Sequence, residues 1–333
     1  MTGVSIACDA TSGASDHRPV ALVLRALGLG DFLAGLPALA LIRQALPGHR
    51  LVLAAPAALA PLVALVPDID ELFDRGELQP LTEFDRRVDV GIDLHGKGPE
   101  SRRLLAALRP ARLIGFADPV AGLTGPQWLR DEHEVARWCR MIDEAFGLGL
   151  GPGRWPGVAG SLDGPPPATD VGVTVVHPGA AAGSRRWPAE RFAAVATELA
   201  AHGHRVLITG GGSEAALAQH VAAASGTTAR TGGTLSELAA TIATARLVVC
   251  GDTGVAHLAS AYRTPSVLLF GPVSPLLWGP PPDLRHVVLW HGDGTGDPHG
   301  AATDPALLRI SVDEVLEAVA TAVLQEPDRA SID

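Results

Sequence analysis

The chain has 333 residues, of which 47% are hydrophobic and 19% are charged, a composition typical of soluble globular proteins. The formal net charge of −10 and the 4% aromatic content argue against a nucleic-acid partner, which would need a basic face and stacking platforms. No apolar run has the length of a membrane-spanning helix, and Met1 to Pro19 lack the regions of a secretion signal.

The three cysteines, Cys8, Cys139 and Cys250, are far apart in the sequence and show no metal-type spacing. We therefore expect a reduced, cytoplasmic compartment. The acidic charge disfavours strong adhesion to an anionic bilayer, although a peripheral membrane contact is compatible with the sequence.

Residues 1–17 are small and polar without a period, which predicts a disordered leader. From residue 18 onward, short runs of Val, Leu and Ile alternate with segments at helical spacing, the pattern of a parallel α/β sheet. The expected strands are 20–25, 51–55, 71–73, 88–94 and 112–116, and the expected helices are 33–46, 57–66, 101–108 and 132–146. Residues 18–150 therefore form the first predicted domain.

A stretch rich in Gly and Pro, residues 147–170, interrupts the alternation, and 151–170 is the predicted linker. Ser311, followed by Glu314, predicts a capping box at the last helix, and 291–303 is predicted to be a loop. After the linker, the expected strands are 171–176, 205–209, 247–250 and 266–270, and the expected helices are 189–201, 214–224, 236–244, 254–262 and 311–325. Residues 171–325 form the second predicted domain, and 326–333 form a tail.

This order of elements predicts two doubly wound, Rossmann-like domains that face each other across a cleft. In such folds ligands bind at the carboxyl edge of the sheet, so informative residues should directly follow strands. Four loops of this chain meet that expectation.

The loop after the first strand contains Gly28, Gly30 and Asp31, without the third glycine of a dinucleotide-binding motif. A carboxylate at a helix N-terminus would repel a pyrophosphate, so Asp31 suits a base that faces a neutral hydroxyl. The alternative is that Asp31 only caps the helix, as most Asp residues in this position do.

The loop after strand 171–176 carries His177 and then Arg185 and Arg186. Guanidinium groups pair well with phosphate oxygens, which favours a phosphate site. The alternatives are a solvated basic pair and, for His177, a hydrogen-bonded loop histidine.

The third loop runs from Thr209 through three glycines to Glu214. Glycines such as Gly211 let a ligand approach the backbone closely, and Glu214 could accept hydrogen bonds from ribose hydroxyls. Alternatively, Ser213 caps the next helix and Glu214 complements its dipole.

The fourth loop follows strand 247–250 and contains Asp252, Thr253 and Gly254. The free N–H groups and the dipole of the following helix favour a diphosphate, while Asp252 could hold sugar hydroxyls and Thr253 could donate to a phosphate. Helix capping by Asp252 or Thr253 would explain each of these residues singly. It would not explain why the same arrangement of strand, polar loop and helix recurs in the chain. Gly271, after the next strand, closes the same edge.

Asp68 and Asp70 match a D-x-D metal-binding pair, but they precede a short strand and so lie on the edge away from the cleft. The sequence contains no zinc-protease motif, no P-loop and no nucleophile elbow. We expect no metal site and no cofactor.

Taken together, these motifs resemble glycosyltransferase family 9, the bacterial heptosyltransferase-like enzymes, over residues 18–324. Residues 28–39 are similar to the family's G-D-x-L-x-x-x-P-A element, and residues 252–258 to its D-[ST]-G-x-x-H-L element. Segments 177–179, 185–188 and 270–272 also fit, with Arg185 where the family commonly carries a phosphate-binding Lys. The loop 291–303 lacks the cysteines that many relatives carry there.

The resemblance implies a GT-B fold and inverting sugar transfer without a required metal, with Asp31 as the catalytic base. The acceptor would bind mainly to the N-terminal domain, where Gly30 and Lys97 are the candidate residues. The donor would bind to the C-terminal domain, at the candidate residues His177, Arg185, Gly211, Glu214, Asp252, Thr253, Gly254, His257 and Gly271.

By family analogy the expected donor is ADP-heptose, and the acceptor is a glycan, a glycolipid or a small molecule. Two other functions stay open on the same architecture. One is a sugar-nucleotide epimerase or hydrolase, which would turn over donor with no acceptor present. The other is a non-catalytic nucleotide-sugar binding protein.

Overall fold

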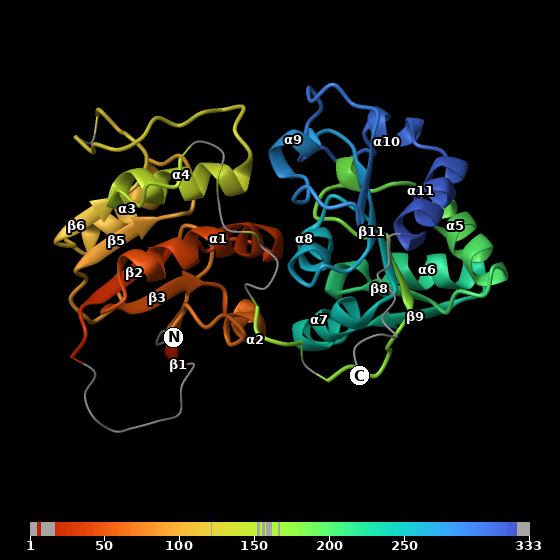
Figure 1. The fold of residues 1–333 in the computed structure, drawn as a ribbon, viewed down its shortest axis with the longest axis horizontal. Coiled ribbons are helices and arrows are strands. Elements are labelled where there is room, and N and C mark those ends of the chain that lie inside the picture. Colours follow the sequence, from red (N-terminus) through yellow and green to blue (C-terminus); the bar gives the residue numbers. More distant parts are fainter. Residues whose placement is uncertain are drawn as a thin grey trace. The chain divides into compact units, whose positions relative to one another are not determined.

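A computed structural model of the chain describes residues 5–7, 17–120, 122–151, 154, 157, 162–165 and 167–324 (Figure 1). By its internal contacts the chain divides into two units, Met1–Gly164 and Pro165–Asp333. The division falls inside the segment predicted to be the linker. The predicted tail and most of the predicted leader, with Cys8, lie outside the described residues.

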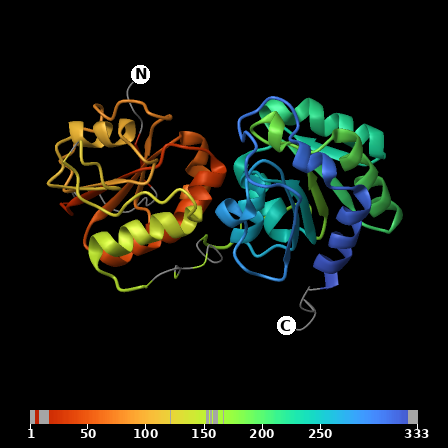
Figure 2. The ribbon, with the colours of Figure 1, turned by 90° about the horizontal axis from the view of Figure 1, so that it is seen from above.

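The first unit contains a six-stranded sheet in the order β1-β4-β3-β2-β5-β6, in which only the β1–β4 pair is antiparallel among the described strands. Figure 2 shows α1 and α4 side by side on one face of this sheet and α3 on the other. The elements are β1 Ser5–Ala7, β2 Val20–Leu24, α1 Leu29–Ala45, β3 Arg50–Ala55, η1 Ala57–Leu59, α2 Ala60–Val63, β4 Glu71–Asp74, β5 Val90–Asp93, α3 Glu100–Ala107, β6 Arg112–Ile114 and α4 Glu134–Phe146.

Burial explains why the central strand and its helix were predictable. All five residues of β2 are buried, the continuous apolar run expected of a strand that is covered on both faces. Helix α1 is buried from Phe32 to Leu39 because it covers one face of the sheet and packs against α4 beside it. These contacts fix the position of the helix start, which carries Asp31.

Three predictions for the first unit were wrong. Helix α1 begins at Leu29 and not at residue 33, because Gly28 already has the extended conformation of an N-cap. The predicted helix 57–66 is only the short turns η1 and α2, which end before Pro67. Ser5–Ala7, inside the predicted disordered leader, form strand β1 against β4.

The second unit also contains a six-stranded sheet, in the order β12-β11-β10-β7-β8-β9, with every pair parallel. Its elements are β7 Thr174–His177, η2 Gly183–Arg185, α5 Ala189–Ala201, β8 Val206–Gly210, η3 Gly212–Glu214, α6 Ala215–Ser225, β9 Thr228–Thr231, α7 Leu235–Thr244, β10 Leu247–Gly251, α8 Gly254–Ala261, β11 Ser266–Phe270, α9 Pro275–Trp278, β12 His286–Trp290, α10 Pro305–Arg309 and α11 Val312–Leu324. Ser311 and Glu314 exchange the two hydrogen bonds of the predicted capping box.

Strands β9 and β12, the two edge strands of this sheet, were not predicted from the sequence. Strand β9 reads Thr-Ala-Arg-Thr and is half-exposed, so it lacks the apolar run that marks a central strand. Strand β12 is only partly buried along its whole length. The predicted strand 171–176 is β7, which starts three residues later.

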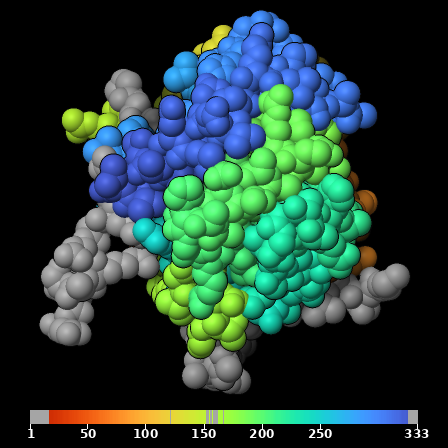
Figure 3. Space-filling model, turned by 90° about the vertical axis from the view of Figure 1, so that its right-hand side faces the viewer, coloured from red at the N-terminus to blue at the C-terminus, as the bar shows by residue number. Residues whose placement is uncertain are grey.

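One face of the second sheet is covered by α5, α6 and α11, whose surfaces adjoin each other in Figure 3. Their apolar side chains form one buried cluster with the strands, including Phe192, Val221 and Val319. No helix in the described part of the chain is long and apolar enough to cross a membrane.

Candidate active site

Most of the predicted site residues follow the strands at which the order of each sheet reverses, and Gly211, Glu214 and Gly271 follow the neighbouring strands β8 and β11. In the first unit the order reverses between β2 and β5, which pair with Leu24 opposite Asp93. In the second unit it reverses between β7 and β10, with His177 opposite Cys250. Ligands of doubly wound sheets bind outside the carboxyl ends of such strands. Each unit therefore has its own candidate binding edge.

Gly30 and Asp31 lie in the first turn of α1, directly after β2. The Asp31 side chain is 33% exposed, so its carboxylate is accessible to a ligand. Gly28 occupies the N-cap position, so the alternative in which Asp31 caps the helix is wrong. An acidic side chain in the first turn is still favoured by the helix dipole.

His95 and Lys97 follow β5, the strand next to β2. The Nδ1 atom of His95 is buried and has no hydrogen-bond partner among the described residues. Burial lowers the pKa of His95, and the charges that act on its ring include those of Arg25 and Asp31. His95 was not predicted as a site residue, although it precedes Lys97 by two residues in the same loop.

A groove of about 700 Å³ lies within the first unit, beside the loops that follow β5 and β6. Its lining includes three basic side chains, Lys97, Arg102 and Arg103. Arg102 is paired with Asp118, with Nη1 2.7 Å from Oδ2. The described lining is therefore basic, in contrast to the acidic chain as a whole.

In the second unit, Arg185 lies in the turn η2, and its Nη1 is 3.7 Å from Oδ2 of the buried Asp252. Arg185 Nε and Ser184 Oγ are both buried and lack a hydrogen-bond partner within the described part of the chain. Buried polar atoms of this kind are rare in folded proteins and mark a candidate ligand-binding position. The two arginines are not a freely solvated pair, because Arg185 faces Asp252 and Arg186 Nε donates to the carbonyl of Ala180.

Helix α8 begins at Gly254, and Thr253 occupies its N-cap position with an extended backbone. The Thr253 side chain makes no capping hydrogen bond to the described residues, so the alternative in which this side chain caps the helix is wrong. The positive end of this helix dipole, at Gly254, adds to the charge of Arg185 and favours an anion.

His177 ends β7 and contacts the loop after the neighbouring strand. Its Nδ1 lies 3.0 Å from Thr209 Oγ1, and its Nε2 lies 3.5 Å from Glu214 Oε2. Burial lowers the pKa of His177, although the charge of Glu214 opposes this shift. The imidazole is therefore neutral near pH 7. It lines a cavity of about 60 Å³ together with Arg230 and Thr234, which the sequence analysis did not identify.

Glu214 closes back over its own loop. Its Oε2 accepts from the Gly211 amide at 3.4 Å. Gly211 is the N-cap of η3 and Glu214 is the N-cap of α6, so the alternative in which Ser213 caps the helix is wrong. A Cβ at position 179 would lie 2.3 Å from the Glu214 carboxyl, so only glycine leaves room for it there. The loop thus holds a carboxylate at the position expected for binding ribose hydroxyls.

The remaining residues that were predicted to bind the donor also lie at the carboxyl edge of the second sheet. His257 is in α8 and packs edge to face against Trp278, with ring centroids 6.0 Å apart. Gly271 follows β11. The predicted loop before α10 supports η2, because the Ser184 amide donates to the Gly300 carbonyl at 2.9 Å.

The D-x-D pair has a structural role at the opposite edge of the first sheet. Asp70 accepts from the Leu51 amide at 2.7 Å and pairs with Arg43. Burial opposes ionisation of Asp70, but these hydrogen bonds hold the pKa of its carboxyl below the usual value. Across the described residues, no group of three or more His, Cys, Asp or Glu side chains is placed to hold a metal ion.

Comparison with solved structures confirms the predicted fold. The family 9 glycosyl transferase from Veillonella parvula DSM 2008 superposes with a TM-score of 0.74 at 22% identity, over 93% of this chain and 98% of that chain. The Escherichia coli ADP-heptose lipopolysaccharide heptosyltransferase II gives 0.73 at 20% identity, over 92% and 99%. The two units therefore have the GT-B fold.

Sequence comparison identifies the family. Lipopolysaccharide heptosyltransferase 2 of Escherichia coli (strain K12) is 29% identical over 161 residues, which are 45% of this chain and 46% of that enzyme. The match thus spans about half the length of that relative. The model of glycosyltransferase family 9 (heptosyltransferase) matches residues 126–295, just over half of the chain. The chain belongs to glycosyltransferase family 9.

Proposed function

We propose that this chain is an inverting glycosyltransferase that moves a sugar from a nucleotide-diphospho-sugar to an acceptor hydroxyl without a metal. The observation that carries the proposal is the group of Arg185, Ser184 and Asp252 at the start of α8. Two buried polar atoms there lack partners among the described residues, and a cation and a helix N-terminus lie beside them. This combination suits a diphosphate.

ADP-heptose is the proposed donor. Support comes from the relatives of the chain, since the matched Escherichia coli enzyme is a heptosyltransferase. The Escherichia coli heptosyltransferase WaaC, with a TM-score of 0.68, was solved with ADP-2-deoxy-2-fluoro heptose. In this chain, Glu214 and Gly211 would hold the ribose of the donor, and the cavity beside His177 and Arg230 would lie next to its adenine ring.

The proposed reaction is a direct displacement at the anomeric carbon. The acceptor oxygen forms a bond to this carbon, the bond from carbon to the diphosphate oxygen breaks, and the acceptor proton passes to the Asp31 carboxylate. A base within hydrogen-bond reach contributes typically ~10²- to 10⁴-fold in rate. Arg185 and the start of α8 would stabilise the negative charge that grows on the leaving diphosphate. The products are an inverted glycoside and a nucleoside diphosphate.

The acceptor is proposed to bind to the first unit, on the side of Gly30 and Lys97. The basic groove lined by Lys97, Arg102 and Arg103 suits a glycan, a glycolipid or a small molecule that carries an anionic group. Lys97→Ala should then raise KM for such an acceptor without changing donor affinity. An unchanged KM would remove Lys97 from the acceptor side.

We also propose a cytoplasmic location, where reduced thiols are stable. Cys139 and Cys250 are free thiols, and burial raises the pKa of each, which makes both unreactive. A glycolipid acceptor would require peripheral contact with a membrane. Cell fractionation with an antibody to the chain tests both statements.

The experiment for the proposed function is a calorimetric titration of the full chain with ADP, UDP, GDP and ADP-heptose. A true donor nucleotide at 100 times its Kd adds about 2.7 kcal/mol to the stability of the chain, which a thermal melt detects independently. Failure of every nucleoside diphosphate to bind would refute the proposal.

Turnover then separates the alternatives. ADP-heptose incubated without acceptor should stay intact, and rapid release of ADP would instead indicate a hydrolase. Transfer to an acceptor should survive EDTA. Loss of transfer in EDTA and its recovery with Mg²⁺ or Mn²⁺ would contradict the metal-independent mechanism.

A further inference from the structure

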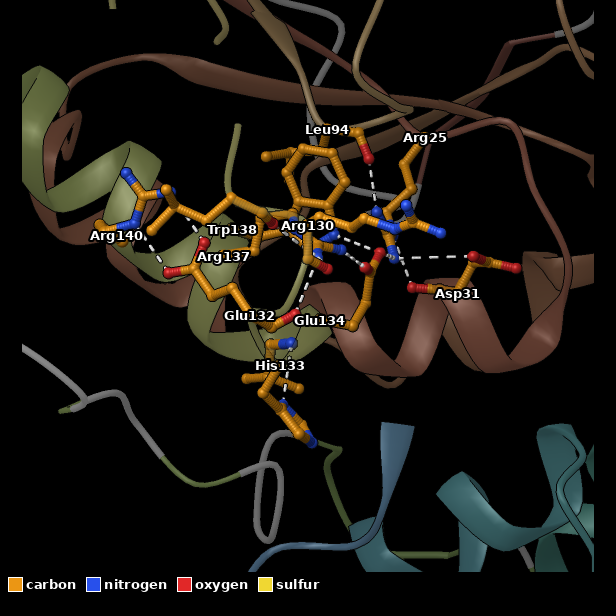
Figure 4. Close-up of polar contacts among 12 residues, drawn as sticks. Arg25, Asp31, Leu94, Arg130, Glu132, His133, Glu134, Arg137, Trp138 and Arg140 are labelled. Atoms are coloured by element: carbon orange, nitrogen blue, oxygen red, sulfur yellow. Dashed lines mark hydrogen bonds and ion pairs between the residues drawn. The ribbon is translucent and has the colours of Figure 1, made fainter. Parts of the chain in front are cut away.

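A fully buried guanidinium, that of Arg25, lies beside Asp31 at the carboxyl end of β2 (Figure 4). Arg25 is 0% exposed. A charge that is completely removed from water persists only when its hydrogen bonds and its counter-charge are well placed. The contacts of Arg25 therefore indicate what the buried charge does.

The donors of Arg25 connect two segments of the candidate acceptor edge. Its Nε donates to the backbone carbonyl of Asp31, in the first turn of α1. Its Nη1 donates to the carbonyl of Leu94, the residue before His95. Arg25 thus joins the turn that carries Asp31 to the loop that carries His95 and Lys97.

The third nitrogen of Arg25 lies between two carboxylates. Nη2 is 3.4 Å from Glu134 Oε1 and 3.9 Å from Asp31 Oδ1. Glu134 is also held by other donors, because Arg137 pairs with its Oε2 and Trp138 Nε1 donates to its Oε1 at 2.6 Å. Glu134 is therefore a fixed counter-charge, and part of the Arg25 charge remains directed at Asp31.

Packing holds the guanidinium in this place. The ring of Trp138 lies 5.1 Å from the Arg25 guanidinium carbon, a cation–π distance. On the side of α1, a Cβ at position 35 would lie 2.8 Å from Arg25 Cδ and Nε, so Gly35 leaves the space for the side chain. Figure 4 shows Arg25 between Asp31 of α1 and the Glu134 and Trp138 side chains of α4.

We propose that Arg25 is the positioning residue for Asp31, joining the first turn of α1 to the end of β5 and fixing the carboxylate that takes the acceptor proton. The inference rests on the proposed function, because it assigns to Arg25 the orientation of that base. Glu134, 109 residues away in sequence, anchors Arg25. Arg25 itself touches no substrate in this proposal.

Arg43 offers a matched control at the other end of the same helix. Its guanidinium donates to the carbonyls of Asp68 and His49 and pairs with Asp70, so it also joins two backbone carbonyls and a carboxylate. Arg43 lies far along α1 from Asp31. Loss of Arg43 should therefore disturb the helix C-terminus and leave the base in place.

The first test is hydrogen exchange on the full-length chain without ligand, in the variants R25M, R25K and R43M. We expect R25M to speed amide exchange about 10-fold in residues 29–33 and 94–97, with other segments unchanged, and R25K to do so less. R43M should speed exchange only near residues 43–50. Unchanged exchange at 29–33 in R25M, or a uniform rise throughout the first unit, would overturn the proposal. If R25M does not fold, R25K must loosen the same two segments.

The second test is steady-state kinetics with the donor and acceptor on which the wild-type chain is active. R25M should lower kcat about 10²-fold, the cost of a base displaced by about 1 Å, with both KM values nearly unchanged. R25K should recover part of kcat, and R43M should match the wild type. A raised KM with normal kcat would contradict a positioning role. If the wild-type chain transfers no sugar, the proposed function fails, and hydrogen exchange still decides the role of Arg25.

Discussion

Removal of the Arg185 guanidinium should weaken diphosphate binding, and variants of the Arg185–Asp252 pair can measure the contribution of each charge. A hydrogen bond to a charged group contributes about 1.5 to 3 kcal/mol, so Arg185→Ala should raise Kd for ADP by ~10- to 150-fold. The variant also leaves the buried Asp252 carboxylate without the cation 3.7 Å away. At 4 Å and an effective dielectric constant of 20, two unit charges interact by about 4 kcal/mol. Without this opposing cation, the negative charge of Asp252 would repel the diphosphate more strongly.

The assay is calorimetric titration of four proteins: wild type, Arg185→Ala, Asp252→Asn and the double variant. The double variant should bind ADP more tightly than Arg185→Ala alone, because it also removes the negative charge of Asp252. Adenosine, which has no diphosphate, should bind all four with similar affinity. Arg191→Gln is the control, because Arg191 donates to the carbonyls of Leu308 and Ile310. Equal ADP affinity in wild type and Arg185→Ala would refute the phosphate role.

Two further predictions concern contacts inside the second unit. Gly179→Ala should displace the Glu214 carboxyl from His177 and weaken ADP binding ~10-fold, about 1.4 kcal/mol. The control Gly48→Ala adds its Cβ in open space and should leave ADP binding unchanged. Equal Kd values for ADP in the two variants would contradict this prediction. Burial lowers the pKa of His286 to about 4, although Asp283 opposes the shift, so the unfolded chain binds a proton that the folded chain does not. The free energy of unfolding should thus fall by up to about 3 kcal/mol between pH 6.5 and pH 4. His286→Gln should flatten this dependence in urea titrations, and an unchanged slope would be the contrary result.

Most of the fold was predictable because buried parallel strands have a strong local signal. Strands β2 and β10 are buried along their whole length and appear in the sequence as unbroken apolar runs. Edge strands lack this signal, which is why β9 and β12 were missed. The start of α1 was placed four residues late because the glycines before Asp31 indicate a loop, whereas in the structure Gly28 is the cap and Gly30 is helical.

The site was predictable only in part, for a different reason. Loops after strands could be identified because the carboxyl edge of a doubly wound sheet is where ligands bind, and Arg185, Asp252 and Glu214 follow from that rule. Arg25 and Glu134 could not, because their contact joins positions 109 residues apart. The available signal for Arg25 was its position, because it is a charged residue directly after the apolar run of β2.

Single-turnover transfer by Asp31→Asn shows whether Asp31 is the base of a sugar transfer. Asp31 is not the N-cap, its side chain is one-third exposed, and Glu134 remains as the nearer counter-charge of Arg25, so the amide should leave the melting temperature and the donor affinity nearly unchanged. Transfer should fall by ~10²-fold or more, because the amide cannot take the acceptor proton. Near-normal transfer by Asp31→Asn would contradict this role of Asp31.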